Sequence, residues 1–183
     1  IEEEVDLRFE LSEYLKQFDT IRGPALLFKN IKGHAMQIAG NLIGTKKRLA
    51  LAFGVQDEEK LLETFLKRRA RKIAPKRVGS GPVKQVIVRD QKKIDLNALP
   101  IPTYHEGDGG PYIACGILIA KSPSTGLRSM GLHRLQIKGK RKMGVHISNP
   151  PISAFATEAE REGKPLDVAI ALGVHPVLLL ASV

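Results

Sequence analysis

The 183-residue sequence is poor in cysteine and in aromatic side chains. Its single cysteine, Cys115, excludes an internal disulfide and a cysteine-based metal cluster, and it agrees with a reducing compartment. Because Cys115 lies within an apolar run, we expect a buried thiol and not a nucleophile. No uncharged apolar run reaches the roughly 18 residues of a membrane span, and no basic–apolar leader opens the sequence. We therefore expect a cytoplasmic protein without a transmembrane segment.

Several standard motifs of catalysis and nucleotide binding are also missing. The sequence has no Walker A motif, no dinucleotide-binding glycine fingerprint, no nucleophile elbow and no HExxH zinc motif. The five histidines are scattered, and no two are four residues apart. His133 and His146 are of most interest, because antiparallel pairing of their segments would bring both to one neighbourhood.

Positive charge is in excess, with a formal net charge of +10. Such a chain could bind nucleic acid or anionic small molecules. The charge is concentrated in two clusters: Lys67, Arg68, Arg69, Arg71, Lys72, Lys76 and Arg77, and Lys138, Lys140, Arg141 and Lys142. Neither cluster is interleaved with aromatic side chains that would stack on bases. We interpret them as a solvent-exposed helix end and a hairpin turn, and keep a nucleic-acid-binding module as the minor alternative.

The first hundred residues have the pattern of a mixed α/β unit. Apolar residues at helical spacing predict helices at 6–18, 46–53 and from Asp57 to Pro75. In the last of these, we expect a buried face of Leu61, Leu62, Phe65 and Leu66. Short apolar runs predict strands at 25–28, 34–39 and 83–88. The prolines of segment 96–102 predict an extended connector, and we place a domain boundary after residue 104.

The remaining residues predict an antiparallel meander followed by helices. Strands are expected at 112–120, 127–137 and 142–147, with turns at 122–126 and 138–140. Such a meander would be the first part of a barrel. A helix at 152–162, a buried strand at 166–172 and a helix beginning at 177 follow.

Two features of this second part could belong to a site. The glycine-dense turn at 106–110 either allows a close approach to a ligand or is a strained entry to the next strand. We favour structural support close to a site. Arg134, between Leu132 and Leu135 in sequence, needs an anionic partner. That partner could be an internal carboxylate, or the carboxylate or phosphate of a substrate.

Several of these segments together closely resemble the UbiD-like carboxy-lyases, the decarboxylases that use prenylated FMN. The segments are GDGGPY at 107–112, RSMGLHRLQ at 128–136, GVHI at 144–147 and EGKPLDVAIALGVHP at 162–176. Further similar segments are RGPALLF at 22–28 and NLIGTKKRLALAFG at 41–54. The resemblance covers nearly the whole chain, with its motifs in the family's order.

The resemblance implies an α+β fold, with an N-terminal α/β domain at 1–104 and the start of a split β-barrel flavin-binding domain at 105–183. The chain would then be a truncated member of the family. The implied activity is loss of CO2 from an α,β-unsaturated or aromatic acid, such as a polyprenyl hydroxybenzoate or anhydromevalonate phosphate. The implied cofactors are prenylated FMN, Mn²⁺ and K⁺. The implied partners are a flavin prenyltransferase and further copies in a dimer or hexamer.

By position, the resemblance assigns the flavin-lining role to Leu132, His133, Arg134, His146, Ile147 and Ser148. Arg134 would also be catalytic, by orienting the substrate carboxylate. The family's metal-binding asparagine falls at Ser129 and its metal-binding histidine at about Pro150, so the metal shell is incomplete. The third metal ligand and the catalytic glutamates would lie beyond Val183. We therefore expect these 183 residues alone to be inactive, and keep a non-catalytic flavin-phosphate-binding subunit as the alternative.

Overall fold

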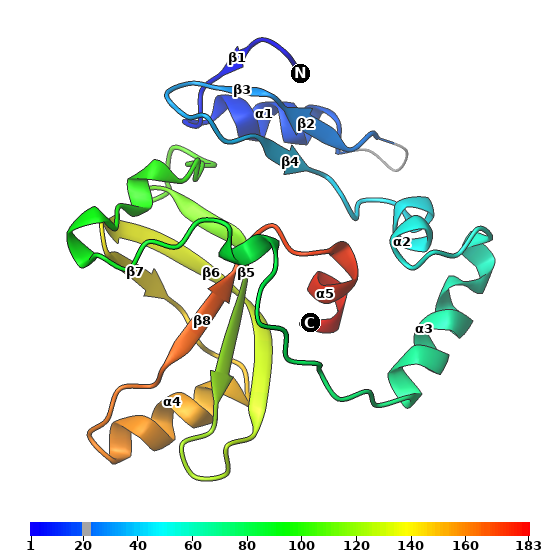
Figure 1. Cartoon of the computed structure of the whole chain (residues 1–183). Helices are drawn as coiled ribbons and strands as arrows, with labels where there is room; N and C mark the ends of the chain where they lie inside the picture. The colour runs from blue at the N-terminus through cyan, green and yellow to red at the C-terminus, as the bar shows by residue number, and fades with distance from the viewer. Residues whose placement is uncertain (20–22) are drawn as a thin grey trace.

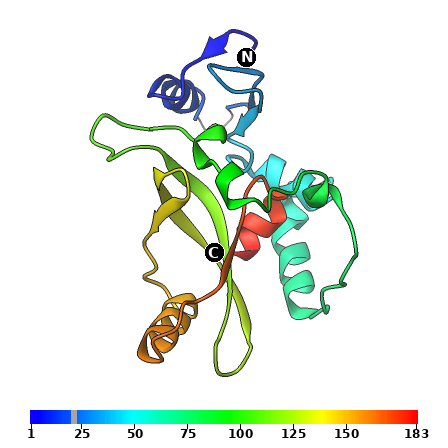
Figure 2. The same cartoon turned by 60° about the vertical axis from the view of Figure 1, so that its left-hand side comes forward.

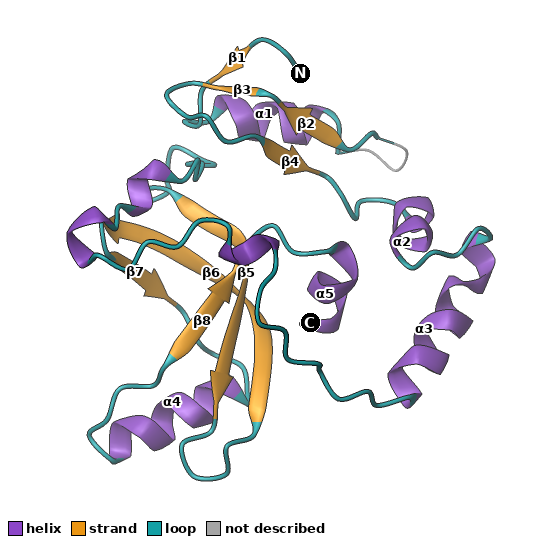
Figure 3. Ribbon diagram, viewed as in Figure 1, coloured by secondary structure: helices purple, strands orange, loops and turns teal. Residues whose placement is uncertain are grey.

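The largest element of the computed structural model is a curled sheet in the second half of the chain (Figure 1). The structure describes residues 1–19 and 23–183, so Arg22 of the RGPALLF segment lies outside the described residues. The sheet contains β5 (Tyr112–Lys121), β6 (Arg128–Gly139), β7 (Lys142–Val145) and β8 (Val168–Ala171), in the order β7-β6-β5-β8. Each neighbouring pair is antiparallel. The predicted meander is therefore confirmed, and Figure 3 shows how strongly it curls.

A bulge in β5 decides which of its side chains are buried. The register pairs Ile113 with Leu135 and then resumes with Gly116 opposite His133, which leaves two residues of β5 between these pairs. Cys115 is one of the two and is exposed. The prediction of a buried thiol was therefore wrong, because the bulge interrupts the alternation that an apolar run would otherwise follow.

The helix predicted at 152–162 forms as α4 (Ile152–Arg161) and covers part of one face of the sheet. Ile152 and Phe155 of this helix pack against Leu118 and Ala120 of β5. The Glu158 carboxylate accepts hydrogen bonds from the Ser124 N–H (2.9 Å) and the Ser122 hydroxyl (3.2 Å). The helix therefore also fixes the turn between β5 and β6.

The strand predicted at 166–172 forms, but it is not buried. Val168 and Leu172 are 45% and 41% exposed, because β8 is an edge strand that pairs only with β5 among the described strands. The last element is α5 (Pro176–Ala181). Figure 2 shows α5 lying against the helices that precede the sheet in sequence. In the described residues, no helix has the length and apolar character needed to span a membrane.

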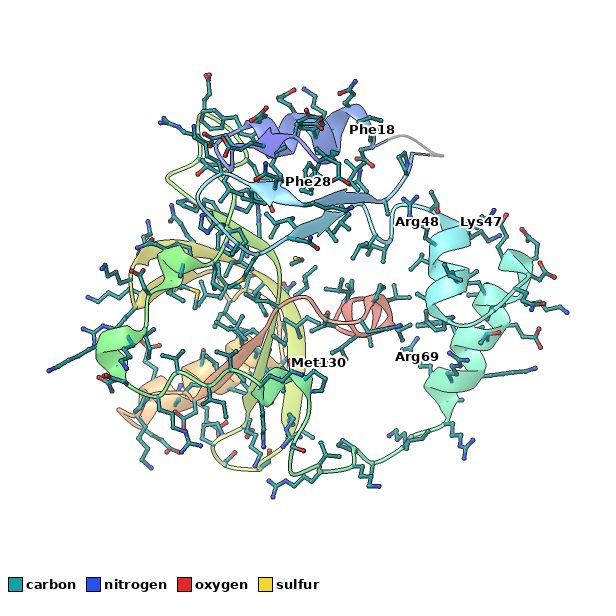
Figure 4. The ribbon with its side chains drawn as sticks, turned by 45° about the horizontal axis from the view of Figure 1, so that its top comes forward. Phe18, Phe28, Lys47, Arg48, Arg69 and Met130 are labelled. Atoms are coloured by element: carbon teal, nitrogen blue, oxygen red, sulfur yellow. The ribbon has the colours of Figure 1, made fainter. Side chains whose placement is uncertain are left out.

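The N-terminal unit packs a short helix on two small sheets. β1 (Glu4–Val5) pairs in parallel with β3 (Asn30–Ile31), and β2 (Leu26–Phe28) pairs antiparallel with β4 (Ile38–Gly40). Leu11 of α1 (Glu10–Gln17) packs among their buried residues, as does Phe28 (Figure 4). Both predicted strands are therefore present, although β4 is shorter than expected.

The two helices that follow are also present. Thr45 caps α2 (Lys46–Ala52), and a 3₁₀ turn, η1 (Glu58–Lys60), leads into α3 (Leu61–Ala70). The predicted buried face of α3 was largely wrong, since Leu62 and Leu66 are 66% and 51% exposed. Its Phe65 ring packs edge-on against Phe53 of α2, with ring centroids 6.2 Å apart. Arg69 extends from α3 toward α5 (Figure 4).

The segment between α3 and the sheet contains no strand. Residues 83–88 form the 3₁₀ turn η2 (Pro82–Lys84) and an irregular stretch, so the predicted strand was wrong. Val83 and Val86 are 89% and 81% exposed, because no neighbouring strand pairs with them in the described structure. Two more 3₁₀ turns follow, η3 (Gln91–Lys93) and η4 (Leu96–Ala98).

The connector at 96–102 starts with η4 and continues extended. Leu96 packs against the buried cluster of Ile113 and Leu135. Thr103 exchanges backbone hydrogen bonds of 3.0 Å with Leu7 and Phe9, and the Ser12 hydroxyl donates to the Tyr104 carbonyl at 2.7 Å. The connector thus ties the N-terminal unit to the sheet, and the boundary after residue 104 stays a prediction.

Candidate functional site

A cavity of about 630 Å³ lies on one face of β5, β6 and β7, and we call it the Arg134 cavity. Strands β5, β6 and β7 contribute Tyr112, Ala114, Arg134, Gln136, Gly144 and Val145 to its lining, and His146 directly follows β7. The loop before β5 contributes Tyr104, His105 and Asp108. The cavity therefore joins the glycine-dense turn to the strand that carries Arg134.

Strand register explains why Arg134 and His146 share this cavity. Leu135 of β6 pairs with Val145 of β7, so these two side chains lie on the same face. Arg134 precedes Leu135 in β6, and His146 is the first residue after β7, so the two residues lie opposite each other across the strand pair, and both line the cavity. The predicted antiparallel pairing of the two segments is confirmed. It brings His146 into one cavity with Arg134, and the His133 side chain does not line that cavity.

The Arg134 guanidinium has no internal anionic partner in the part of the chain that the structure describes. None of its nitrogens makes an ion pair or hydrogen bond with a described residue. Arginine stays charged at all physiological pH values and offers five donors in a planar fork. An anionic group that enters the cavity would therefore find a charged, unengaged donor.

The glycine-dense turn supports the cavity wall. The Asp108 carboxylate accepts a hydrogen bond from the His105 N–H, and the Asp108 N–H donates to the His105 carbonyl, both at 3.0 Å. A Cβ on Gly109 would lie 2.8 Å from Nε2 of Gln136. Glycine thus allows the backbone to approach the Gln136 side chain, which agrees with structural support close to a site.

Tyr104 presents a neutral phenol to the cavity. Burial raises the pKa of this phenol from 10.0 to about 12, and negative charge at Cys115 and Asp108 acts in the same direction. The hydroxyl therefore keeps its proton at neutral pH and can donate a hydrogen bond. Sequence reasoning missed Tyr104, His105 and Gln136. Side chains alternate along a strand, so Gln136 projects to the same face as Arg134, and this alternation would have identified Gln136 as a cavity residue.

His133 points away from the Arg134 cavity. Its side chain is 8% exposed, and its Nδ1 lies 3.3 Å from the His146 carbonyl oxygen. It borders a second hollow, the α4 pocket, whose volume is about 450 Å³. Residues that line the α4 pocket include Gly131, Leu132, His133, Asn149, Pro151 and Ser182.

The remaining predicted site residues lie outside both hollows. Ile147 packs against the cluster of Leu118 and Phe155. The exposed Ser148 hydroxyl donates to Oδ1 of Asn149 at 3.3 Å. Ser129 pairs with Ala120 in the sheet. The six predicted flavin-lining residues are therefore divided between the Arg134 cavity, the α4 pocket and the segment after β7, where Ile147 is partly buried and Ser148 is exposed.

The described residues do not by themselves supply the side chains of a manganese site. They include no group of three or more histidine, cysteine, aspartate or glutamate side chains that could hold a metal ion. Hard cations such as Mn²⁺ prefer oxygen ligands, carboxylates among them, and Ser129 supplies only a neutral hydroxyl. No step of the chemistry below therefore passes through a metal.

Two family comparisons cover most of the chain. Residues 76–183 match the 3-octaprenyl-4-hydroxybenzoate carboxy-lyase Rift-related domain, and residues 1–68 match the N-terminal domain of the same enzymes. Among curated proteins, an uncharacterized Synechocystis protein is 32% identical over 98% of this chain. The anhydromevalonate phosphate decarboxylase of Methanothermobacter thermautotrophicus is 28% identical over 100% of it. The matched regions are 40% and 41% of these two relatives' lengths.

Solved structures of decarboxylases also resemble this chain. An evolved dimeric form of the UbiD-class enzyme HmfF from Pelotomaculum thermopropionicum, in complex with prFMN, matches with a TM-score of 0.92 and 40% identity. The match covers 100% of this chain and 42% of that one. The 3,4-dihydroxybenzoic acid decarboxylase AroY of Klebsiella pneumoniae matches with a TM-score of 0.86 and 29% identity, over 96% of this chain and 39% of that one.

Proposed function

Because the chain belongs to the UbiD family of carboxy-lyases, we propose that it forms the flavin- and carboxylate-binding part of a decarboxylase. The reaction removes CO2 from an α,β-unsaturated or aromatic acid. The observation that carries this proposal is the position of Arg134, which has no described anionic partner and shares a cavity with His146. The Arg134 cavity lies on a sheet that is similar to those of UbiD-class enzymes.

Prenylated FMN is the proposed cofactor. Two HmfF structures that resemble this chain contain prFMN and FMN. The volume of the Arg134 cavity falls within the roughly 300–1,000 Å³ that is usual for cofactor sites. Ala114 and Gly144 line it with small side chains, which leaves room for a planar ring. When bound, the modified flavin supplies an electron sink for the electron pair left by departing CO2. In this proposal, the curled sheet is one part of a split β-barrel.

Arg134 binds and orients the carboxylate of the substrate. A bidentate contact from its planar guanidinium fixes both carboxylate oxygens and so aligns the bond that breaks. The product CO2 is neutral, so the charged contact is lost when the bond has broken and release is not hindered.

The proton that replaces CO2 must come from an acid. Tyr104 is too weak an acid for this step, with its pKa at about 12, and we assign it a hydrogen bond to the substrate or flavin. The Asp108 carboxylate already holds the His105 N–H. We therefore propose that the acid comes from sequence outside these 183 residues, since the curated relatives are more than twice as long as the region they share with this chain.

Substrate and partners follow from the same family membership. The named relatives act on anhydromevalonate phosphate and on 3,4-dihydroxybenzoic acid, which supports an unsaturated or aromatic acid as the substrate. We also propose a cytoplasmic homo-oligomer, for which the dimeric HmfF form is the support. A flavin prenyltransferase would supply the cofactor.

A coexpression experiment tests the proposal. A longer protein that contains this chain is produced together with a flavin prenyltransferase, and its flavin absorbance and CO2 release from a panel of unsaturated and aromatic acids are measured. We expect both signals from the longer protein, and neither tightly retained flavin nor turnover from the 183 residues alone. Flavin retention without CO2 release from any acid would instead favour a non-catalytic flavin-binding subunit, which the absence of an ion pair to Arg134 among the described residues also permits.

A further inference from the structure

A further hollow, which we call the α5 pocket, lies between the N-terminal helices and α5 (Figure 2). Its volume is about 480 Å³. Phe53, at the end of α2, and Phe65 of α3 line it from the N-terminal side, and Val177 and Leu180 of α5 line it from the other. The Phe53 ring is 4% exposed and packs edge-on against Phe65, so these aromatic walls are fixed. The α5 pocket is therefore a preformed apolar hollow.

Two arginines of α3 also line the α5 pocket. The guanidinium carbon of Arg68 lies 5.6 Å from the centre of the Phe53 ring, and Arg69 extends toward α5 (Figure 4). Neither arginine makes an ion pair with a described residue, and the ion pair within α3 joins Lys67 to Glu63. No aspartate or glutamate lines the pocket. Two cationic groups thus face apolar walls without an anion between them.

The chemistry of these walls selects a narrow class of ligand. Two guanidinium groups exclude a cation, and a small hydrated anion would gain nothing from the aromatic and aliphatic walls. An arginine that lies over an aromatic ring keeps the N–H groups at its edge free, and this planar fork matches the two oxygens of a carboxylate. The volume lies within the roughly 300–1,000 Å³ that is usual for sites of small organic molecules.

From this geometry we propose that the α5 pocket is a binding site for a small carboxylic acid with an apolar body, such as an aromatic acid. The body lies between Phe65 and Leu180. The carboxylate lies at Arg68 and Arg69. No residue lines both this pocket and the Arg134 cavity, so the site is separate from the one that carries the proposed reaction.

Helix α5 connects the α5 pocket to the strand that carries Arg134. The C-cap of α5 is Ser182, whose carbonyl accepts a hydrogen bond of 3.2 Å from the N–H of Leu132 in β6. Leu132 precedes Arg134 by two residues. An acid that bridges α3 and α5 therefore strengthens the contact between the N-terminal unit and the sheet beside the Arg134 cavity.

Calorimetric titration of the longer protein that contains this chain tests this proposal. The probes are 2-naphthoate, its neutral amide 2-naphthamide, and acetate, which has the carboxylate without the apolar body. The double variant Arg68→Gln, Arg69→Gln should bind 2-naphthoate about 10-fold more weakly than the wild type, because it loses charge-assisted hydrogen bonds. Naphthamide should bind the two proteins equally, and acetate should bind neither measurably.

A matched control removes the same charge from the same helix end. Arg71→Gln, Lys72→Gln lowers the net charge by two, but neither residue lines the α5 pocket. This variant should bind 2-naphthoate like the wild type. An equal loss in both double variants would show that the general positive field attracts the acid, and would overturn the site.

A second variant keeps the test decisive if the first one misfolds by circular dichroism. Arg68→Lys, Arg69→Lys retains both charges, and a cation over the Phe53 ring, but loses the planar fork. Binding of 2-naphthoate should again weaken, with binding of naphthamide unchanged.

The remaining outcomes separate the α5 pocket from the Arg134 cavity. A preference for naphthoate over naphthamide that persists in Arg134→Lys and disappears in Arg68→Gln, Arg69→Gln supports the proposal. A preference that disappears only in Arg134→Lys places the acid in the Arg134 cavity and overturns it. Naphthoate affinity that is unmeasurable, or equal in the wild type and in a folded pocket variant, also overturns it. The titration requires no turnover, so its result does not depend on the proposed decarboxylase activity.

Discussion

At the scale of single residues, adjacent side chains of β6 face different sites. Arg134 projects into one hollow and His133 into the other, which follows directly from strand alternation. The need of Arg134 for an anion could be predicted from its chemistry and its apolar sequence neighbours. The positions of Ile147 and Ser148 could not, because β7 ends at Val145 and the alternation stops there.

The raised pKa of Tyr104 predicts that the stability of the folded chain depends on pH in the alkaline range. Its pKa in the folded chain, about 12, is above the 10.0 of an exposed phenol. Above about pH 10, an unfolded chain loses this proton while the folded chain keeps it, so the free energy of unfolding falls as pH rises from about 10 to 12. Urea unfolding at a series of pH values should show this fall, and Tyr104→Phe should reduce it. An identical pH dependence in the two proteins would contradict the burial of this phenol.

At the scale of elements, most of the predicted helices and strands form, and an apolar run alone was the weakest basis for a prediction. The helix that begins after Thr45, the turn at 122–126 and the meander of β5, β6 and β7 form as expected. The strand expected at 83–88 does not form. Its apolar residues show only that the sequence is compatible with a strand. A strand also needs a partner, and the described sheets supply none there.

The bulge in β5 makes a prediction about stability. A Cβ on Gly116 would lie 2.4 Å from Cδ1 of Leu135, which is 1% exposed, and 3.2 Å from Cγ2 of Ile113. Gly116→Ala should therefore lower the free energy of unfolding by about 1–3 kcal/mol through overpacking. Urea unfolding measures this change. Gly107→Ala is the control, because nothing lies within 4 Å of its added Cβ, and a change within about 0.5 kcal/mol is expected. Equal effects of the two substitutions would show that the bulge is not packed as described.

At the scale of the whole molecule, one stretch of the chain accounts for the net positive charge. Residues 67–93 contain eleven lysines and arginines and one acidic residue, Asp90, so this stretch alone carries the chain's +10. It spans the end of α3 and the irregular segment after it. The rest of the chain is balanced in charge.

This distribution predicts weak and nonspecific contact with nucleic acid. Residues 67–93 contain no aromatic side chain, so binding to a duplex would rest on phosphate contacts alone and fall steeply with salt. At an ionic strength of about 0.15 M, where the screening length is about 8 Å, fluorescence anisotropy should detect no binding to a random duplex. Sequence-dependent binding that persists at this salt would favour the nucleic-acid-binding alternative.

In this member of the UbiD family, the proposed catalytic role rests on one side chain, that of Arg134. The most direct test uses the longer protein loaded with prenylated flavin, in which CO2 release is measured for Arg134→Lys and for Arg128→Lys. Lysine keeps the charge but loses the bidentate fork, and Arg128 starts the same strand outside the Arg134 cavity. We expect Arg134→Lys to lower kcat by at least about 100-fold with flavin absorbance retained, and Arg128→Lys to leave kcat unchanged. Equal activity of the two variants would contradict the assignment of Arg134 as the residue that orients the carboxylate.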